Sequence, residues 1–425
     1  MDEGTTGKRL GNELIDVEKA LAHVYPEVRT SYDERDVLLY ALGVGAGAAE
    51  RDLRFVFEKH PEFAALPTYV VAPALSVALA NELKGERSPG LNYGFERILH
   101  SVQRTELMRP LPRAATLRHQ ARVKAIYDAR KYGVVVTEVR TCDEAGEALA
   151  INEFTLTVRG AGGFGGEPGP SGAVNLPPKR APDAVVEQPT REDQALLYRL
   201  SGDRNPLHVD PVFAQEFGLP KPILHGLCTY GFAARHVLRA VAADDASNLK
   251  SIRVKFAAPV YPGETLVTEL WQESPTRVVF ETKAKERDKA VLSNAAVEFF
   301  RPLPAAAVPV AAPSVGPATS PGSAAIQALG ERLDSALVRQ VAAVVQLRVQ
   351  EPASDWVLDL KIAPGAVRRG IAADADLTLQ MADADLAAWL AGASVKDLLS
   401  AGRVRMVSGD GRVVQRLAAA LASRG

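Results

Sequence analysis

The side chains best suited to chemistry lie in the stretch Ser201-Gly202-Asp203-Arg204-Asn205-Pro206-Leu207-His208-Val209-Asp210. Asp203 places a carboxylate a short distance before the imidazole of His208, and Asn205-Pro206 between them predicts a turn. Because histidine titrates near neutral pH and a carboxylate accepts protons, we expect the pair to hold and activate one water molecule. The alternative for the same residues is an Asx-turn cap beside a surface histidine.

Two predicted helices flank this loop and would position it. Apolar residues recur with helical spacing over residues 192–200, and Pro222-Ile223-Leu224-His225-Gly226-Leu227 leads into a second helix. The N-terminus of a helix offers N–H groups without partners and a positive dipole end. Glycine also lets a ligand approach the backbone closely. We therefore expect the Gly226 N–H to stabilise an oxyanion such as an enolate.

The bulk composition narrows the class of protein. The 425 residues suggest two to four domains, and 47% hydrophobic with 24% charged residues is typical of a globular protein. A net charge of −1 gives no reason to expect binding to nucleic acid or to an anionic membrane. The polar N-terminus is unlike a secretory signal, and the apolar run 69–80 contains Pro73 and is too short for a membrane span. We expect a cytoplasmic protein.

Two cysteines, Cys142 and Cys228, form neither a disulfide framework nor a cluster of metal ligands. Cys228 follows Gly226 closely, but no basic residue is adjacent to it in the sequence. We expect a small buried hydrophobe there rather than a nucleophile.

The sequence repeats internally after roughly 150 residues, which predicts two copies of one α+β unit. Tyr198 occupies the position in the second copy that Tyr40 occupies in the first. The first copy, however, has Val44-Gly45-Ala46-Gly47-Ala48 where the second carries Asp203 and His208. Only the second copy therefore carries the chemistry. Helices are expected at 36–43, 66–84 and 193–200, and strands at 117–127, 134–140, 150–158, 265–272, 278–286 and 290–300.

Changes in composition predict the domain boundaries. The first repeat occupies 1–166, a Pro-rich connector 167–190, the second repeat 191–301, a Pro- and Ala-rich linker 302–323 and a third domain 324–425. In the third domain we expect helices at 326–349, 383–392 and 413–422, and strands at 356–362, 367–371, 377–381 and 404–407. This domain has no histidine or cysteine, and so lacks the usual nucleophiles and bases.

Several of these motifs together resemble a known family. The motif residues Tyr198, Asp203, Asn205, Pro206, His208 and Asp210, with the run Ile223-Leu224-His225-Gly226-Leu227-Cys228-Thr229, resemble the hydratase 2 motif of MaoC-like, (R)-specific enoyl-CoA hydratases. The resemblance extends over 15–301 and is close to the two-repeat form found in peroxisomal multifunctional enzyme type 2. It implies a tandem double hotdog fold, in which each sheet wraps a helix and the first repeat lacks the catalytic pair.

The resemblance also implies roles for individual residues. Asp203 and His208 would activate water for syn addition across a trans-2-enoyl-CoA, the Gly226 N–H would bind the thioester oxygen, and Asn205 would steady the loop. Further polar positions of the family's active site match Glu58, Tyr198 and Asp210. Substrate contacts match His100, Ser101, Arg130, Arg204, Pro206, Leu207 and Phe256.

The third domain is similar to the sterol carrier protein 2 (SCP2) family over 324–421. The similarity is carried by Trp356-Val357-Leu358-Asp359-Leu360-Lys361, Ala375-Asp376-Leu377-Thr378-Leu379-Gln380-Met381, the helix through Gly392, and Ser400-Ala401-Gly402-Arg403-Val404. It implies a smaller α+β domain, in which helices cover a five-stranded sheet with an apolar tunnel for lipid or acyl-CoA.

The expected activity is hydration of 2-enoyl-CoA to (3R)-3-hydroxyacyl-CoA, with a preference for long or bulky chains such as steroid side chains. No metal, nicotinamide or flavin site is recognised, and CoA enters as part of the substrate. The resemblance also implies a homodimer. Two alternatives stay open: an acyl-CoA thioesterase, since hotdog folds host both reactions, and a non-catalytic carrier of acyl-CoA or sterol.

Overall fold

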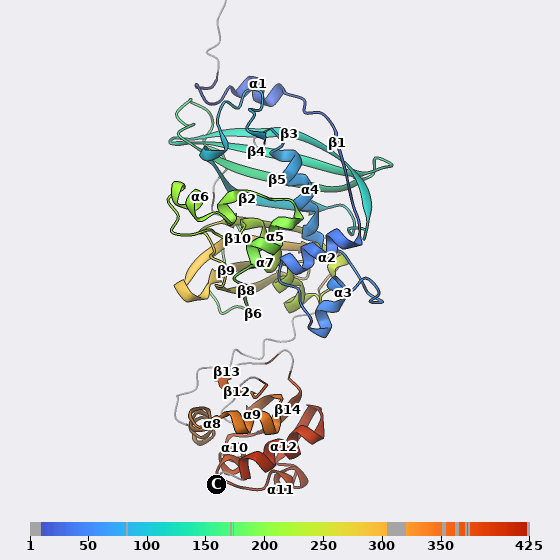
Figure 1. The fold of residues 1–425 in the computed structure, drawn as a ribbon, viewed down its shortest axis with the longest axis vertical. Coiled ribbons are helices and arrows are strands. Elements are labelled where there is room, and N and C mark those ends of the chain that lie inside the picture. The colour runs from blue at the N-terminus through green and yellow to red at the C-terminus, as the bar shows by residue number, and fades with distance from the viewer. Residues whose placement is uncertain are drawn as a thin grey trace, which may run out of the picture. The chain divides into compact units, whose positions relative to one another are not determined.

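The computed structural model describes residues 10–81, 84–170, 172, 174–303, 320–350, 354–361, 365–369, 372 and 375–422 (Figure 1). The chain divides into two compact units, Met1–Ala307 and Val308–Gly425. Each unit has its own large hydrophobic core. Most of the predicted linker, residues 304–319, lies outside the described residues.

The first unit is built on one antiparallel sheet of ten strands in the order β1-β3-β4-β5-β2-β7-β10-β9-β8-β6. The first five strands are β1 (Val28–Tyr32), β2 (Ile98–Leu107), β3 (Ala115–Ala129), β4 (Tyr132–Asp143) and β5 (Ala148–Arg159). The other five are β6 (Ala184–Pro189), β7 (Leu249–Phe256), β8 (Thr265–Ser274), β9 (Arg277–Ala284) and β10 (Lys289–Phe299). The halves join where β2 pairs with β7. This arrangement confirms the two predicted repeats and the double hotdog.

Each half of the sheet carries one central helix. In the first repeat α4 (Val71–Ala78) packs against β3, β4 and β5, and in the second α7 (Gly226–Val241) packs against β6, β7, β8 and β10 (Figure 1). Every residue of α7 from Leu227 to Leu238 is buried, as expected of a helix inside a core. The helix predicted over 66–84 is shorter than expected: a 3-10 turn, η2 (Pro67–Val70), precedes α4, and α4 ends at Ala78.

The repeats meet through corresponding helices. Helix α2 (Glu34–Gly43) packs against α5 (Gln194–Tyr198), and the rings of Tyr40 and Tyr198 lie 6.0 Å apart. A Cβ at Gly43 would stand 3.3 Å from the Tyr198 Cα, so glycine permits this close approach. Tyr40 and Tyr198, which correspond in the two sequence repeats, therefore also lie next to each other in the structure.

Short helical elements complete the first unit. They are α1 (Val17–Ala22), η1 (Glu50–Asp52), α3 (Leu53–Val56), η4 (Phe95–Arg97), η5 (Arg199–Ser201), η6 (Pro206–His208), α6 (Pro211–Glu216), η7 (Ala246–Asn248) and η8 (Lys285–Arg287).

The predicted connector 167–190 needs correction. Its last part forms strand β6, which pairs with β8 and so belongs to the second repeat. The segment Ala184-Val185-Val186-Glu187-Gln188-Pro189 alternates half-buried and exposed residues along this sheet edge. Pro189 ends the strand, where its missing N–H costs no ladder bond. The prolines upstream of this alternation had suggested a connector over the whole stretch.

The second unit has a five-stranded sheet in the order β13-β12-β11-β14-β15. The strands are β11 (Val344–Gln350), β12 (Ser354–Asp359), β13 (Ala366–Arg369), β14 (Leu377–Ala382) and β15 (Val404–Gly409). The helices are α8 (Pro321–Glu331), α9 (Ser335–Val341), α10 (Asp383–Leu390), α11 (Val395–Ser400) and α12 (Gly411–Ala422). A sheet of five strands with helices is what the SCP2 resemblance implied.

The single helix predicted over 326–349 is wrong. Asp334 caps a new helix by accepting bonds from Ala336 N and Leu337 N, and Ala342 ends it with φ +46. The residues that follow, from Val344, form the central strand β11, flanked by β12 and β14. The continuous apolar residues of a fully buried strand also fit the spacing of one face of a helix, and for this reason the sequence pattern predicted a single helix.

Candidate active site

Asp203 lies in the loop between η5 and η6, and His208 is the last residue of η6, across the turn that Asn-Pro predicts. The Asn205 side-chain oxygen accepts a hydrogen bond from Leu207 N at 3.0 Å and caps η6, which begins at Pro206. Asn205 N donates in turn to the Asp203 carboxylate at 3.2 Å. Two consecutive Asx turns therefore hold the loop, and the role expected for Asn205 has a structural basis.

The hydrogen bond made by His208 sets its tautomer. Its Nδ1 lies 2.8 Å from the Ile223 carbonyl, which can only accept, so Nδ1 carries the proton. Burial lowers the pKa of His208, although the nearby Asp203 carboxylate acts in the opposite direction. His208 is then neutral at pH 7, and its Nε2 presents a free lone pair, as a general base requires.

His225 belongs to the motif run quoted from the sequence, but no role was predicted for it there. Its ring stacks on His208, with centroids 3.6 Å apart and an interplanar angle of 27°. Its Nε2 donates to the Asp203 carbonyl at 3.1 Å, and burial lowers its pKa well below the ordinary value. His225 is also the N-cap of α7. It therefore joins the catalytic loop to the helix that follows, and its place just before a helix start was the available signal.

Gly226 is the first residue of α7, whose first N–H groups have no acceptor within the helix. A Cβ at Gly226 would stand 3.1 Å from the ring of Phe256. Glycine thus leaves room for a thioester oxygen to reach this N–H, beside a positive helix end.

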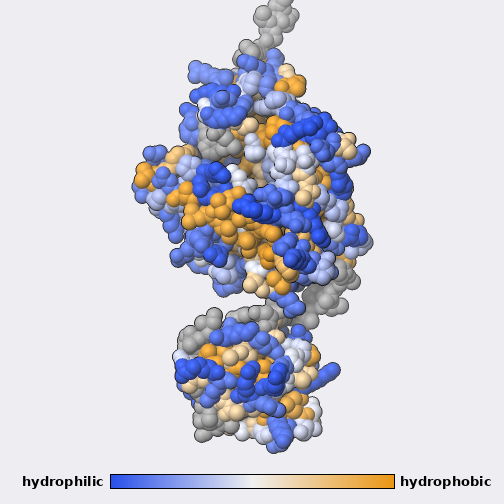
Figure 2. Space-filling model, turned by 45° about the vertical axis from the view of Figure 1, so that its right-hand side comes forward, coloured by the Kyte–Doolittle hydropathy of each residue, from blue (hydrophilic) through white to orange (hydrophobic). Residues whose placement is uncertain are grey.

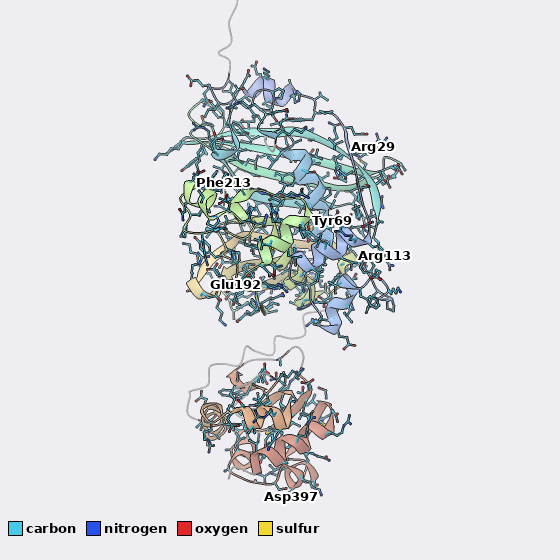
Figure 3. The ribbon with its side chains drawn as sticks, in the orientation of Figure 1. Arg29, Tyr69, Arg113, Glu192, Phe213 and Asp397 are labelled. Atoms are coloured by element: carbon cyan, nitrogen blue, oxygen red, sulfur yellow. The ribbon has the colours of Figure 1, made fainter. Side chains whose placement is uncertain are left out.

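Asp203, Asn205, His208 and Gly226 line one cavity of about 390 Å³. The first repeat also lines this cavity, with Ala72, Leu75 and Ser76 of α4, Leu79 just after α4, and Ile98, Leu99 and His100 of β2. Figure 3 labels Tyr69 in the segment that leads into α4, and Phe213 in α6 of the second repeat. Both repeats therefore line the cavity, and the first repeat contributes mainly apolar residues to it.

Three of the predicted substrate contacts line this cavity: His100, Leu207 and Phe256. The rings of His100 and Phe256 lie 4.9 Å apart, and burial lowers the pKa of His100 to about 4. His100 is consequently neutral at pH 7 and contributes an aromatic wall rather than a charge.

Tyr198 stands behind the catalytic groups. It is buried, and its ring packs 4.9 Å from that of His225. Cys228 is also buried and its thiol lies 3.3 Å from the Gly43 carbonyl, while burial raises its pKa well above the ordinary value. Cys228 is therefore a packed hydrophobe, as expected.

The other predicted site residues do not line the cavity. Glu58 is exposed and lines a separate depression with Asp33 and Leu38. Asp210 is the N-cap of α6 and accepts from Val212 N at 2.9 Å, which accounts for its place in the motif. Motif matching alone cannot separate such capping residues from residues that face a ligand.

Four predicted substrate contacts also lie off the cavity lining. Ser101 donates to the Thr155 carbonyl at 3.0 Å within the sheet, and Arg204 and Pro206 are exposed on the outer side of the loop. Arg130 is exposed in the turn between β3 and β4, with φ +64.

Asp203, His208 and His225 each offer one ligand atom, and these atoms lie within 4.8 Å of one another. A carboxylate with two imidazoles is a donor set that suits transition-metal ions. The sequence alone does not predict this grouping, because His225 reaches the loop only through the tertiary fold.

Family comparisons cover both units of the chain. The MFE-2 hydratase 2 N-terminal domain matches residues 30–160, the MaoC like domain matches 174–295, and the SCP-2 sterol transfer family matches 325–422. The boundary between the first two matches follows the two repeats of the sheet.

Individual relatives agree with these matches. Enoyl-CoA hydratase 2, peroxisomal, of Arabidopsis thaliana is 42% identical over 64% of this chain and 92% of its own length. The peroxisomal multifunctional enzyme type 2 of Mus musculus is 41% identical over 85% of this chain, which spans only 49% of that relative. A crystal structure of a MaoC-like dehydratase from Phytophthora capsici aligns with a TM-score of 0.60 at 33% identity, over 67% of this chain and 98% of its own.

The described helices include none with the length and apolarity needed to cross a membrane. The fold, the loop of Asp203 and His208 and the relatives all point the same way. The chain belongs to the MaoC-like enoyl-CoA hydratase 2 family and carries an SCP2 domain after its two hydratase repeats.

Proposed function

We propose that the first unit hydrates trans-2-enoyl-CoA to (3R)-3-hydroxyacyl-CoA. The observation that carries this proposal is one cavity lined by Asp203, by His208 with its free Nε2, and by Gly226 at a helix N-terminus. A base for water and a donor for the thioester oxygen are the two parts that addition to an enoyl thioester needs.

In the proposed reaction, His208 Nε2 takes a proton from water while the water oxygen bonds to C3 of the substrate. The electron pair of the C2–C3 double bond moves toward the thioester oxygen, where the Gly226 N–H stabilises the negative charge. Asp203 orients the water. The proton that His208 took is then delivered to C2 of the enolate, so that one water is added and His208 returns to its neutral state. The same steps in reverse describe dehydration.

Asp203→Asn and His208→Ala test this reading. Each should lower kcat by roughly 10²- to 10⁴-fold, which is the usual contribution of a positioned acid or base. Loss of enoyl absorbance reports hydration, chiral analysis of the product tests the (3R) assignment, and a thiol assay reports thioester hydrolysis. Thiol release by the wild type would favour a thioesterase. Full activity in both variants, with acyl-CoA binding intact, would favour a carrier.

We also propose a preference for long or bulky acyl chains. The cavity wall from the first repeat is largely apolar and carries no catalytic pair, which leaves space for a chain. Comparing kcat/KM for crotonyl-CoA, a long-chain enoyl-CoA and a steroid enoyl-CoA tests this. Highest efficiency on crotonyl-CoA would contradict it.

We propose further that the SCP2 domain binds lipid or acyl-CoA. Displacement of a fluorescent fatty acid from the full chain would test this.

We propose that the reaction needs no cofactor beyond the CoA of its substrate. Since Asp203, His208 and His225 form a possible ligand set, dialysis against a chelator is the decisive test. Hydration unchanged after dialysis supports the proposal. Activity that is lost on dialysis and returns with added Zn²⁺ would instead assign the water to a metal.

The remaining proposals concern assembly and location. A homodimer is supported by Leu196 and Leu200, each 54% exposed, and by the apolar band on one face of the first unit in Figure 2. The molar mass from light scattering would test it.

The comparisons do not support the predicted cytoplasmic location, since the relatives from Mus musculus and Arabidopsis thaliana are named as peroxisomal. Fractionation of the source cells decides between these compartments.

A further inference from the structure

The catalytic cavity has one strongly basic residue in its lining, Arg159. It is the last residue of β5, and its side chain is exposed. It makes no ion pair with any residue in the described part of the chain. The other lining residues around it, such as Leu156 and Leu99, are apolar. A cation without a partner at the edge of an apolar cavity is suited to an anionic part of the ligand.

Three further cations lie at the same end of the sheet. Arg159 pairs with Tyr132 at the start of β4, which places Lys131 and Arg130 next to it. The Gly160 N donates to the Lys131 carbonyl at 3.2 Å. Arg97, just before β2, donates from Nη1 to the Arg159 carbonyl at 3.3 Å. The cations are therefore clustered by strand pairing and not by neighbouring sequence.

The acidic groups at this end are fewer and partly engaged. Glu96 lies 3.9 Å from Arg97. The Asp128 carboxylate accepts from the N–H groups of Gly163 and Gly165 at 2.8 and 2.7 Å, so its charge is already matched by backbone donors. Glu167 adds a third carboxylate, because its carbonyl accepts from the Asp128 N–H at 2.7 Å. The four cations still outnumber the three carboxylates at this edge.

We infer that Arg159 binds the phosphate groups of the CoA portion of the substrate while the acyl chain occupies the cavity. The inference rests on the proposed function, because it takes enoyl-CoA as the ligand. The guanidinium of arginine pairs with phosphate in a bidentate manner, and phosphates are the anionic groups of CoA. Arg97 and Lys131 add to the positive field at this edge. Arg159 is thus a substrate-binding residue, and the family resemblance did not point to it.

The test compares thioesters with and without phosphate. Kinetics of Arg159→Gln and Arg159→Glu are measured with an enoyl-CoA, the corresponding enoyl-dephospho-CoA and the N-acetylcysteamine thioester of the same acyl group. Arg140→Gln is the matched control, because Arg140 is an exposed arginine further along β4, facing Gln120 of β3. A thioester without phosphate also shows that each variant is folded and catalytically competent.

We expect Arg159→Gln to raise KM for enoyl-CoA roughly 10-fold with little change in kcat, and Arg159→Glu to raise it further. KM for the N-acetylcysteamine thioester should not change in either variant. Raised salt should increase the wild-type KM for enoyl-CoA more than that of Arg159→Gln. A smaller effect of the substitution with dephospho-CoA would assign the contact to the 3′-phosphate, and an equal effect would assign it to the pyrophosphate.

An equal rise in KM for all three thioesters would indicate a packing role and overturn the inference. An unchanged KM for enoyl-CoA in Arg159→Glu would also overturn it. If the wild type hydrated none of the thioesters, the proposed function itself would fail. If it hydrated all of them while Arg159→Glu behaved like Arg140→Gln, only the phosphate contact would fail.

Discussion

At the scale of single residues, the site depends on which nitrogen of each imidazole is free. The Nδ1–H of His208 donates a hydrogen bond to the Ile223 carbonyl, which leaves Nε2 free to accept from water. The Nε2–H of His225 donates to the Asp203 carbonyl. Both rings are buried and neutral, so they stack without mutual charge repulsion. Under the proposed mechanism, His208 is the base and His225 has a positioning role.

Replacement of Gly226 tests the proposed oxyanion site at this scale. A Cβ there would stand 3.1 Å from Phe256, so Gly226→Ala should move the ring and narrow the space in front of the N–H. We expect kcat to fall roughly 10- to 100-fold, as small misplacements of reacting groups do. Steady-state hydration kinetics measure this.

Phe256→Leu in the Gly226→Ala background is the companion variant. A smaller side chain should relieve the contact and restore part of the lost kcat, whereas Phe256→Leu alone should affect KM more. Full activity of Gly226→Ala would show that the thioester oxygen binds elsewhere.

At the scale of elements, a buried ion pair ties the first repeat to α7. Asp52, in η1, accepts from Arg235 Nη2 at 2.9 Å and also pairs with Arg239. Asp52 additionally accepts from the Gly47 N–H at 3.1 Å. Arg235 is 2% exposed, so loss of the carboxylate would leave a buried cation without its counter-ion.

Asp52→Asn should therefore lower the free energy of unfolding of the first unit by about 3–5 kcal/mol. Urea denaturation followed by tryptophan fluorescence measures the loss. Asp193→Asn is the control, because Asp193 pairs with Arg191 at an exposed site, where an ion pair contributes little to stability. Equal small effects of the two variants would show that the buried pair does not hold the repeats together.

At the scale of the whole molecule, buried neutral histidines make the first unit sensitive to acid. Burial lowers the pKa of both His100 and His119 to about 4, against an ordinary value of 6.5. Between these pH values the unfolded chain binds protons that the folded chain does not. The contribution of these two histidines to the free energy of unfolding should therefore be constant above pH 6.5 and should fall as the pH decreases from 6.5 to 4.

Urea midpoints at pH 8, 6.5 and 5 would measure this dependence. His119 bonds to Thr30 and Thr141 and lies outside the cavity lining, so His119→Gln should make the slope shallower without abolishing activity. A midpoint that rises on acidification would contradict the prediction.

The division into two units makes a second prediction at this scale. All residues that line the catalytic cavity lie between Ala72 and Leu292, within the first unit. A chain ending at Ala307 should therefore hydrate crotonyl-CoA with unchanged kcat/KM. Loss of this activity in a truncated chain with a normal unfolding transition would show that the SCP2 domain contributes to the site.

The sequence alone determined the parts that depend on local chemistry. Asn-Pro between Asp203 and His208 fixes a turn, Gly226 marks a helix start, and the recurrence of Tyr40 as Tyr198 reveals the two repeats. These signals need only near neighbours or a comparison of the chain with itself, and the fold class follows from them.

Tertiary structure alone decided which distant residues face the ligand. It placed His225 on His208, brought Arg159 to the edge of the cavity, and kept Glu58 and Asp210 away from it. It also made strands of residues 184–189 and 344–350, where proline or helical spacing suggested otherwise. Each outcome depends on strand pairing and packing between distant segments, and no local pattern records those contacts.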